Sequence, residues 1–72
     1  MAISYITKIQ NIASQNDSNV ARLKLEAIFI KMAVENIDAE TVEEAFSTVR
    51  SYLNHHDAEF LVRTYRDNHY WS

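Results

Sequence analysis

Residues 16–38 read NDSNVARLKLEAIFIKMAVENID, and this segment decides the fold class of the chain. An asparagine and an aspartate stand at each end, and no helix-breaking residue lies between them. Aspartate is a preferred helix N-cap, because its carboxylate accepts hydrogen bonds from the free amides of the first turn. Asparagine substitutes for glycine in the left-handed conformation that often follows a helix. The segment therefore predicts a helix over residues 18–35, with a boundary on either side.

The same asparagine and aspartate pattern divides the rest of the chain. Asn16, Asn36 and Asn54 are each followed within three residues by an aspartate. These boundaries predict four helices joined by very short turns, at about residues 2–15, 18–35, 39–53 and 56–69. The chain has no glycine and no proline, and the tight turns of strand-rich folds depend on glycine. The predicted fold is therefore all-α, a compact bundle of four short helices in one domain.

The size of the chain limits how it is stabilised. A domain of 72 residues buries about 60% of the surface that its unfolded chain exposes. Domains this small usually add disulfides, a metal, oligomerisation or very efficient helix packing, and the absence of cysteine excludes disulfides. The most apolar run, residues 27–34, is interrupted by Lys31 and is too short to cross a bilayer. A soluble cytoplasmic protein is expected.

The helix predicted over residues 18–35 is apolar on two sides. One set of residues follows alternating steps of three and four, as in a coiled coil: Val20, Leu23, Ala27, Ile30, Val34 and Ile37. A second set lies on nearly the opposite side: Leu25, Ile28, Phe29 and Met32. Such a helix is either central in its own bundle or shared with a second chain. We expect a two-fold homodimer with the second set as its interface, and a monomer with a central second helix is the alternative.

Residues 54–60, NHHDAEF, place two histidines beside two carboxylates and raise the question of a metal site. On a helix His55 and Glu59 share one side, whereas His56 points about 100° away from them. The H-E-x-x-H spacing of zinc enzymes is absent. A helix start explains the same residues, with Asn54 as the N-cap and the acids where the helix dipole favours them. No metal and no cofactor are expected.

Signatures of catalysis are also absent from the sequence. The chain has no cysteine nucleophile, no glycine-rich phosphate loop and no nucleophile elbow. A four-helix chain of this length rarely encloses a pocket with converging polar groups, which is the usual setting for small-molecule chemistry. An enzymatic function is therefore not expected.

Acidic residues are concentrated around the predicted start of the third helix: Glu35, Asp38, Glu40, Glu43 and Glu44. The helix dipole explains part of this concentration, because it favours acids near an N-terminus. The functional interpretation is a surface that binds a basic region of another protein. We assign Glu40, Glu43 and Glu44 to that surface.

The last predicted helix carries a second group of candidate contact residues: Arg63, Arg66, Tyr70 and Trp71. Aromatic and arginine side chains are enriched at interface hot spots. The expected function is therefore a non-catalytic protein-binding module, acting as a small regulator, adaptor or inhibitor of a larger partner. The alternative is a helix-turn-helix regulator that contacts nucleic acid through Arg63, Arg66 and Tyr70. The net charge of −3 weighs against this alternative, because nucleic-acid binding depends on neutralising phosphates.

Overall fold

The computed structural model describes residues 5–71, without the side chains of Tyr70 and Trp71. The described residues form four helices: α1 (Tyr5–Gln15), α2 (Ser18–Val34), α3 (Ala39–Tyr52) and α4 (His55–Trp71). The predicted all-α bundle is confirmed, and only the predicted start of the first helix, at residue 2, lies outside the described residues. None of these four helices has the length and apolarity of a membrane span.

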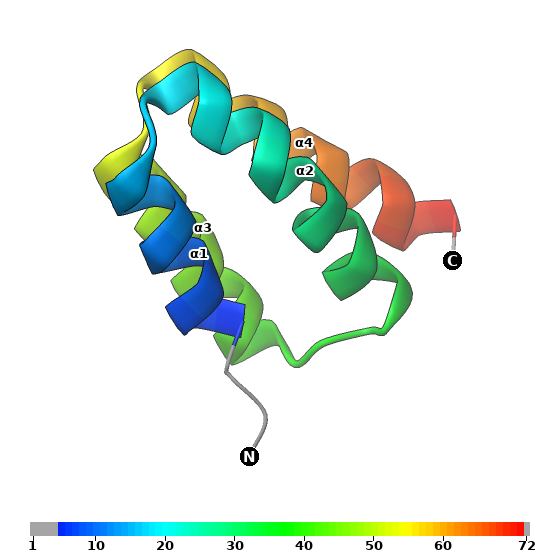
Figure 1. Cartoon of the computed structure of the whole chain (residues 1–72). Coiled ribbons are helices and arrows are strands. Elements are labelled where there is room, and N and C mark those ends of the chain that lie inside the picture. The colour runs from blue at the N-terminus through cyan, green and yellow to red at the C-terminus, as the bar shows by residue number, and fades with distance from the viewer. Residues whose placement is uncertain (1–4, 72) are drawn as a thin grey trace.

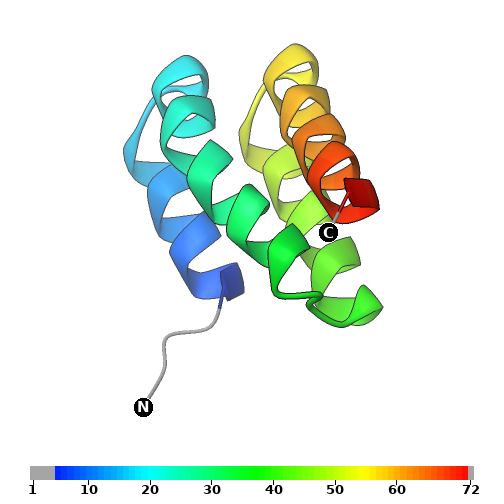
Figure 2. The same ribbon diagram turned by 90° about the vertical axis from the view of Figure 1, so that its right-hand side faces the viewer.

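The helices form two hairpins that lie side by side (Figure 2). The first consists of α1 and α2, the second of α3 and α4, and a two-residue turn joins the helices of each. Helix α1 lies along α3 and α2 lies along α4, so that the two pairs enclose an angle (Figure 1). Buried apolar residues from all four helices fill this angle as one core, and its largest fully buried side chains are Phe29, Ile9, Leu25, Met32 and Leu61.

A row of aromatic rings crosses the core from α2 to α4. The rings of Phe29 and Phe46 are nearly parallel, with their centroids 6.3 Å apart. Phe46 in turn meets Tyr65 edge to face at 5.5 Å. Offset and edge-to-face pairs of this kind are the favoured aromatic geometries. The row therefore links three of the four helices through side chains that are far apart in the sequence.

Helix α2 turns inward the side that was expected, from the sequence, at a dimer interface. Leu25, Phe29 and Met32 have no exposed surface, and Ile28 packs against the same core. The residues predicted to bind a second chain thus belong to the core of the chain itself, because α1 and α4 both pack on that side of α2. The opposite side faces solvent. The homodimer itself stays a prediction.

The end of α2 shows how the chain turns without glycine. Asn36 has a φ of 56°, which makes it the one described residue in the left-handed region. The amide of Asn36 donates to the carbonyl oxygen of Ala33, and the amide of Ile37 donates to that of Met32. This pair of hydrogen bonds is the Schellman arrangement, in which the residue after the helix end is left-handed. The predicted role of asparagine as a substitute for glycine is confirmed at this position.

The other two asparagines end or begin helices in a different way. The side-chain amide of Asn16 donates to the carbonyl oxygen of Ile12 at 2.9 Å and so satisfies the last turn of α1 directly. The side chain of Asn54 accepts a hydrogen bond from the amide of Asp57 at 2.9 Å and caps the start of α4. The expectation of a left-handed asparagine at all three boundaries therefore holds only for Asn36 among the described residues.

Aspartate residues cap the two helices between these boundaries, as predicted. The carboxylate of Asp17 accepts from the amide of Val20 at 3.0 Å and caps α2. The carboxylate of Asp38 accepts from the amide of Thr41 at 3.1 Å and caps α3. Each cap satisfies an amide that has no partner within its helix.

The two hairpin turns meet at one end of the molecule, where a polar network joins α2 to α4. The carboxylate of Asp57 accepts from Nε of Arg22 at 3.1 Å and from Oγ of Ser18 at 2.6 Å. Oγ of Ser18 accepts from the amide of Asn54 at 3.0 Å. The guanidinium of Arg22 also lies 4.7 Å from the ring centroid of Phe60. We call this network of Ser18, Arg22, Asn54 and Asp57 the closed end.

Candidate protein-binding cleft

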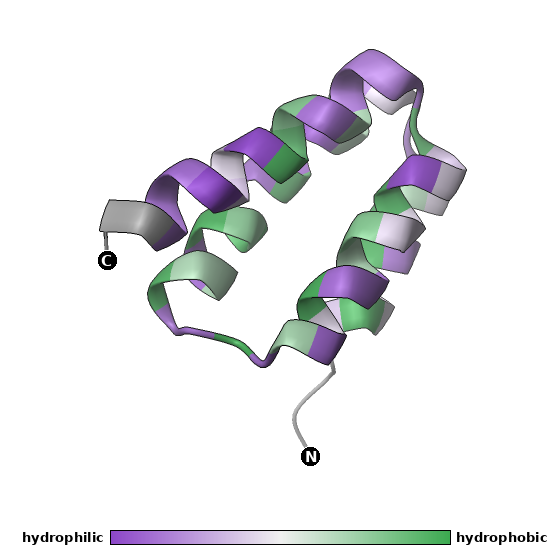
Figure 3. Ribbon diagram, turned by 180° about the vertical axis from the view of Figure 1, so that it is seen from behind, coloured by the Kyte–Doolittle hydropathy of each residue, from purple (hydrophilic) through white to green (hydrophobic). Residues whose placement is uncertain are grey.

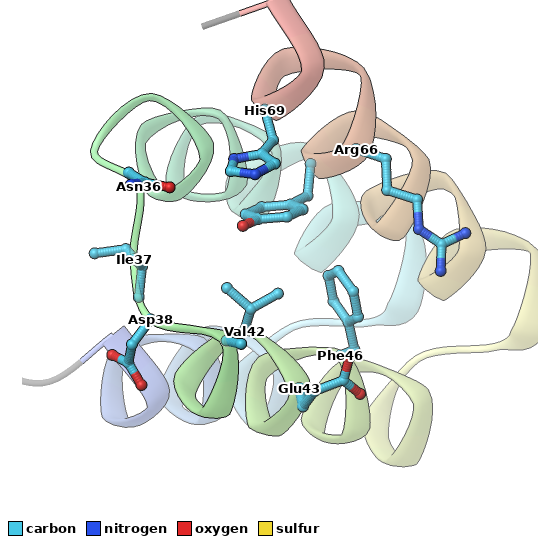
Figure 4. Close-up of a pocket in the computed structure, with 10 residues that line it drawn as sticks. Asn36, Ile37, Asp38, Val42, Glu43, Phe46, Arg66 and His69 are labelled. Carbon is cyan, nitrogen blue, oxygen red and sulfur yellow. The ribbon is translucent and has the colours of Figure 1, made fainter.

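The opposite end of the bundle is open and contains a cleft of about 440 Å³. Three segments line it: the connection between α2 and α3, the first half of α3, and the last turns of α4. Figure 4 shows Val42 and Phe46 pointing from α3 toward His69 of α4, with Ile37 at one side. The left-handed Asn36 positions this cleft, because it turns the chain from α2 into the connection that forms one wall.

The floor of the cleft is apolar and aromatic. Val42, Phe46 and Tyr65 are all buried, and Phe46 and Tyr65 belong to the aromatic row of the core. The ring of His69 stacks on Tyr65 with centroids 5.3 Å apart. Burial raises the pKa of the Tyr65 phenol, so this side chain is uncharged at neutral pH. The floor is therefore a preformed surface that does not have to be ordered when a ligand binds.

The rim of the cleft carries charges of opposite sign on facing walls. Glu43 stands on α3, and Arg66 stands on α4 (Figure 4). Both side chains are exposed, and neither has an ion-pair partner within the described part of the chain. The two charges are therefore available to a bound molecule.

The five clustered acids divide into two with structural roles and three that are available to a partner. The carboxylate of Glu35 accepts a hydrogen bond from the Tyr5 hydroxyl, and this bond raises the pKa of the Tyr5 phenol. The carboxylate of Asp38 accepts from the hydroxyl and the amide of Thr41, and these bonds lower the pKa of Asp38. The acids without such a role are all exposed: Glu40, Glu43 and Glu44.

The structure divides the acidic part of the predicted partner-binding set. Glu43 lines the cleft, whereas Glu40 and Glu44 are exposed on α3 outside its lining. Residues four apart on a helix share a side, so Glu40 and Glu44 form one ridge, and Glu43 stands beside it. The acidic surface therefore begins at the cleft and continues over the outer side of α3.

The residues predicted on the last helix are separated as well. Arg66 lines the cleft, whereas Arg63 is exposed and lines a second depression of about 100 Å³ together with Phe60. The side chains of Tyr70 and Trp71 lie outside the described residues. Of the predicted partner-binding residues whose side chains the structure describes, Glu43 and Arg66 are thus the two that the fold brings to one cleft.

Sequence reasoning did not identify the floor of the cleft. The 3.6-residue period marks Val42 and Phe46 as core positions, and both are buried. Their second role, as the floor of the cleft, follows from the open end of the bundle, where no other described helix covers this edge of the core. For His69, the available signal was its spacing of four residues from Tyr65, which places the two rings on one side of α4.

The histidine pair at the start of α4 shows no sign of metal coordination. His55 and His56 are both exposed, and the neighbouring Asp57 is directed to Arg22 and Ser18 of α2. Within residues 5–71, no three histidine, cysteine, aspartate or glutamate side chains are grouped so as to hold an ion. The capping role of Asn54 accounts for this segment.

The nucleic-acid alternative depends on the outer face of α4, which is mostly hydrophilic (Figure 3). Arg63 and Arg66 are exposed there. Glu59 and Asp67 stand four residues before and after Arg63, so acids share its side of the helix. A phosphate backbone along this face would meet carboxylates as well as guanidinium groups, which weakens the alternative.

No family model, no curated protein and no solved structure matches this chain. The chemistry of the cleft therefore has to follow from its own residues. Its described lining contains no serine, cysteine or lysine, and it presents two carboxylates, an imidazole and a guanidinium around the rings of Phe46 and Tyr65.

Proposed function

We propose that this chain is a non-catalytic protein-binding module, which acts as a small regulator, adaptor or inhibitor by holding a segment of a larger partner in the cleft. One observation carries the proposal: an aromatic floor of Phe46 and Tyr65 lies between the carboxylate of Glu43 and the guanidinium of Arg66. Interface hot spots have this composition, with aromatic and arginine side chains around a desolvated centre and a polar rim.

The charges around the cleft specify the partner segment. An apolar anchor side chain would occupy the floor, in contact with Val42, Phe46 and Tyr65. A basic residue on one side of the anchor would face Glu43. An acidic residue on the other side would face Arg66. Opposite charges on the two walls thus fix the direction in which a segment lies.

The proposal is tested by selecting binders from a displayed library of random peptides against the whole chain. We expect enrichment of peptides that carry one large apolar residue next to arginine or lysine. A selected peptide should then shift the backbone amide resonances of Val42 and Phe46 in a ¹H–¹⁵N correlation spectrum. Absence of enrichment, or shifts confined to other surfaces, would contradict the proposal.

Charge reversals with matched neighbours locate the site on the cleft. Glu43→Lys and Arg66→Glu change exposed side chains of the lining, and we expect each to weaken a selected peptide at least about tenfold. Glu44→Lys and Arg63→Glu make the same changes on the same helices outside the lining, and we expect about twofold effects. Equal losses in both sets would assign binding to overall charge and not to the cleft.

Gel shifts with double-stranded DNA at two salt concentrations test the nucleic-acid alternative. Protein binding through the cleft predicts no shifted DNA at physiological salt. Binding that weakens steeply with salt and disappears in Arg63→Glu would favour the helix-turn-helix interpretation and overturn the proposal.

A further inference from the structure

The solvent side of α2 carries a continuous apolar row, in which four residues are exposed and Ile30 is half-buried. It consists of Val20, Leu23, Ala27, Ile30 and Val34, which we call the α2 stripe. Leu23 is 56% exposed and Val34 is 61% exposed, more than any other large apolar side chain described. Ile37 continues the spacing in the sequence, but it lies beyond the end of α2 and packs against the core.

We propose that the α2 stripe is the interface of a homodimer in which the two copies of α2 lie parallel about a two-fold axis. Single exposed apolar residues are ordinary on protein surfaces, but a row of five in one register is not. The residues follow steps of three, four, three and four, so the stripe runs straight along the helix for about 21 Å. A second copy of the same helix matches this row in length and spacing.

The residue types in the stripe favour two parallel strands. In heptad terms, Val20, Ala27 and Val34 occupy a positions, and Leu23 and Ile30 occupy d positions. Parallel two-stranded coiled coils prefer β-branched residues at a and leucine at d. Valine at both ends of the a row and leucine at the first d position agree with this preference.

The charges beside the stripe select the parallel orientation. Lys24 and Lys31 occupy e positions on one flank, and Glu26 occupies a g position on the other. In a parallel pair, a g residue faces the e residue five positions later in the second copy, so Glu26 meets Lys31 twice by symmetry. In an antiparallel pair, the e positions face each other and so do the g positions. Depending on the register, Lys24 would then face Lys31, or the two copies of Glu26 would face each other.

The α2 stripe is separate from the cleft, whose lining includes none of its residues. Because each cleft begins at the C-terminal end of α2, a parallel dimer would carry both clefts at the same end. Two clefts on one face would bind a partner with two matching segments more tightly than one cleft alone. The dimer does not depend on the proposed function, and either proposal can fail alone.

Sedimentation equilibrium of the whole chain, from micromolar to millimolar concentration, tests the dimer. We expect the mass to approach twice the chain mass of 8.4 kDa. Leu23→Glu and Val34→Glu should remain at the chain mass throughout, with unchanged far-UV circular dichroism because both positions are exposed. The matched control is Tyr52→Glu, which changes an exposed apolar residue of α3 outside the stripe and should still dimerise. A monomer at every concentration, or a dimer of Leu23→Glu, would overturn the proposal.

Single cysteines test the orientation cleanly, because the chain has none of its own. In a parallel pair, equivalent residues face each other, so Leu23→Cys and Ile30→Cys should each give a cross-linked dimer under mild oxidation. In an antiparallel pair, Leu23→Cys and Ile30→Cys cannot both do so, because the two positions lie about 10 Å apart along the helix and only one of them can lie near the two-fold axis. Cross-linking of at most one of these two variants would overturn the parallel arrangement.

Charge exchange gives an independent measurement of the same orientation. We expect Lys31→Glu and Glu26→Lys each to weaken dimerisation about tenfold, and the double variant to recover most of the loss. In an antiparallel pair with Lys24 facing Lys31, Lys31→Glu should instead strengthen dimerisation, because this change would relieve the repulsion between the two lysines. Tighter association of Lys31→Glu would therefore contradict the parallel pair.

Discussion

The two ends of the bundle differ in the kind of side chain that each one buries. At the closed end, polar side chains are buried and paired: Asp57 is 5% exposed and contacts both Arg22 and Ser18. At the open end, apolar rings form a floor while the charged side chains of the rim stay in solvent. No buried side-chain nitrogen or oxygen among the described residues lacks a hydrogen-bond partner. The comparison indicates that one end of this small protein holds the hairpins together, which leaves the other end available for binding.

The largest effect is expected from Asp57→Ala at the closed end. This change leaves the guanidinium of Arg22 largely buried without its carboxylate, and it removes the hydrogen bond from Ser18. Breaking a buried ion pair by removing one partner costs about 3 kcal/mol. Urea unfolding followed by circular dichroism should show this loss in the free energy of unfolding.

An exposed ion pair of the same length provides the control. Glu59 of α4 accepts from Nε of Arg50 of α3 at 3.1 Å, and both side chains are more than one third exposed. Exposed pairs contribute about 0.2–1 kcal/mol, so Glu59→Ala should lower the free energy of unfolding far less than Asp57→Ala. Equal losses in the two variants would mean that the closed end does not hold the hairpins together in this way.

The sequence could predict the features of both ends that depend on neighbouring residues. The caps at Asp17, Asp38 and Asn54 and the left-handed turn at Asn36 each involve contacts within a few residues. These contacts follow from residue type and spacing alone. They determine where the helices begin and end, and hence most of the fold.

The features that sequence reasoning missed depend on contacts between distant segments. Asp57 was interpreted as a first-turn acid, whereas its partner Ser18 lies 39 residues earlier. Which side of α2 faces the core depends on where α1 and α4 pack, and the apolar pattern of α2 is compatible with either choice. The cleft likewise follows from the angle between the α1–α3 pair and the α2–α4 pair, which no local pattern encodes. The cleft residues Glu43 and Arg66 were predicted because exposed charge is visible in the sequence.

A smaller effect is expected at the open end from substitution of Asn36. Its φ of 56° is costly for alanine and free of strain for glycine. Asn36→Ala should lower the free energy of unfolding by about 1 kcal/mol, whereas Asn36→Gly should leave it equal or slightly raised. Thermal unfolding of both variants measures the difference.

Asn16 provides the matched control for this substitution at the other end of α2. Its φ is not positive, and its side chain donates to the carbonyl oxygen of Ile12. Asn16→Gly should therefore destabilise the protein, although it is the same change that is tolerated at Asn36. A destabilising effect of Asn36→Gly as large as that of Asn16→Gly would show that the left-handed turn is not what Asn36 contributes.

The smallest effect concerns the proton affinity of Asp38 at the rim of the open end. The hydrogen bond from the Thr41 hydroxyl, followed by that from its amide, lowers the pKa of Asp38 below its ordinary value. The pKa of Asp38 is lower in the folded protein than in the unfolded chain. The Asp38 carboxylate therefore stabilises the fold fully above its unfolded-state pKa, and this stabilisation is lost as the pH falls through its folded-state pKa. Thr41→Val removes only the hydroxyl and should raise the pKa of Asp38, as measured by NMR titration of its carboxyl carbon. Thr41→Ser keeps the hydroxyl and should keep the pKa low, so equal values in the two variants would assign the shift to the amide alone.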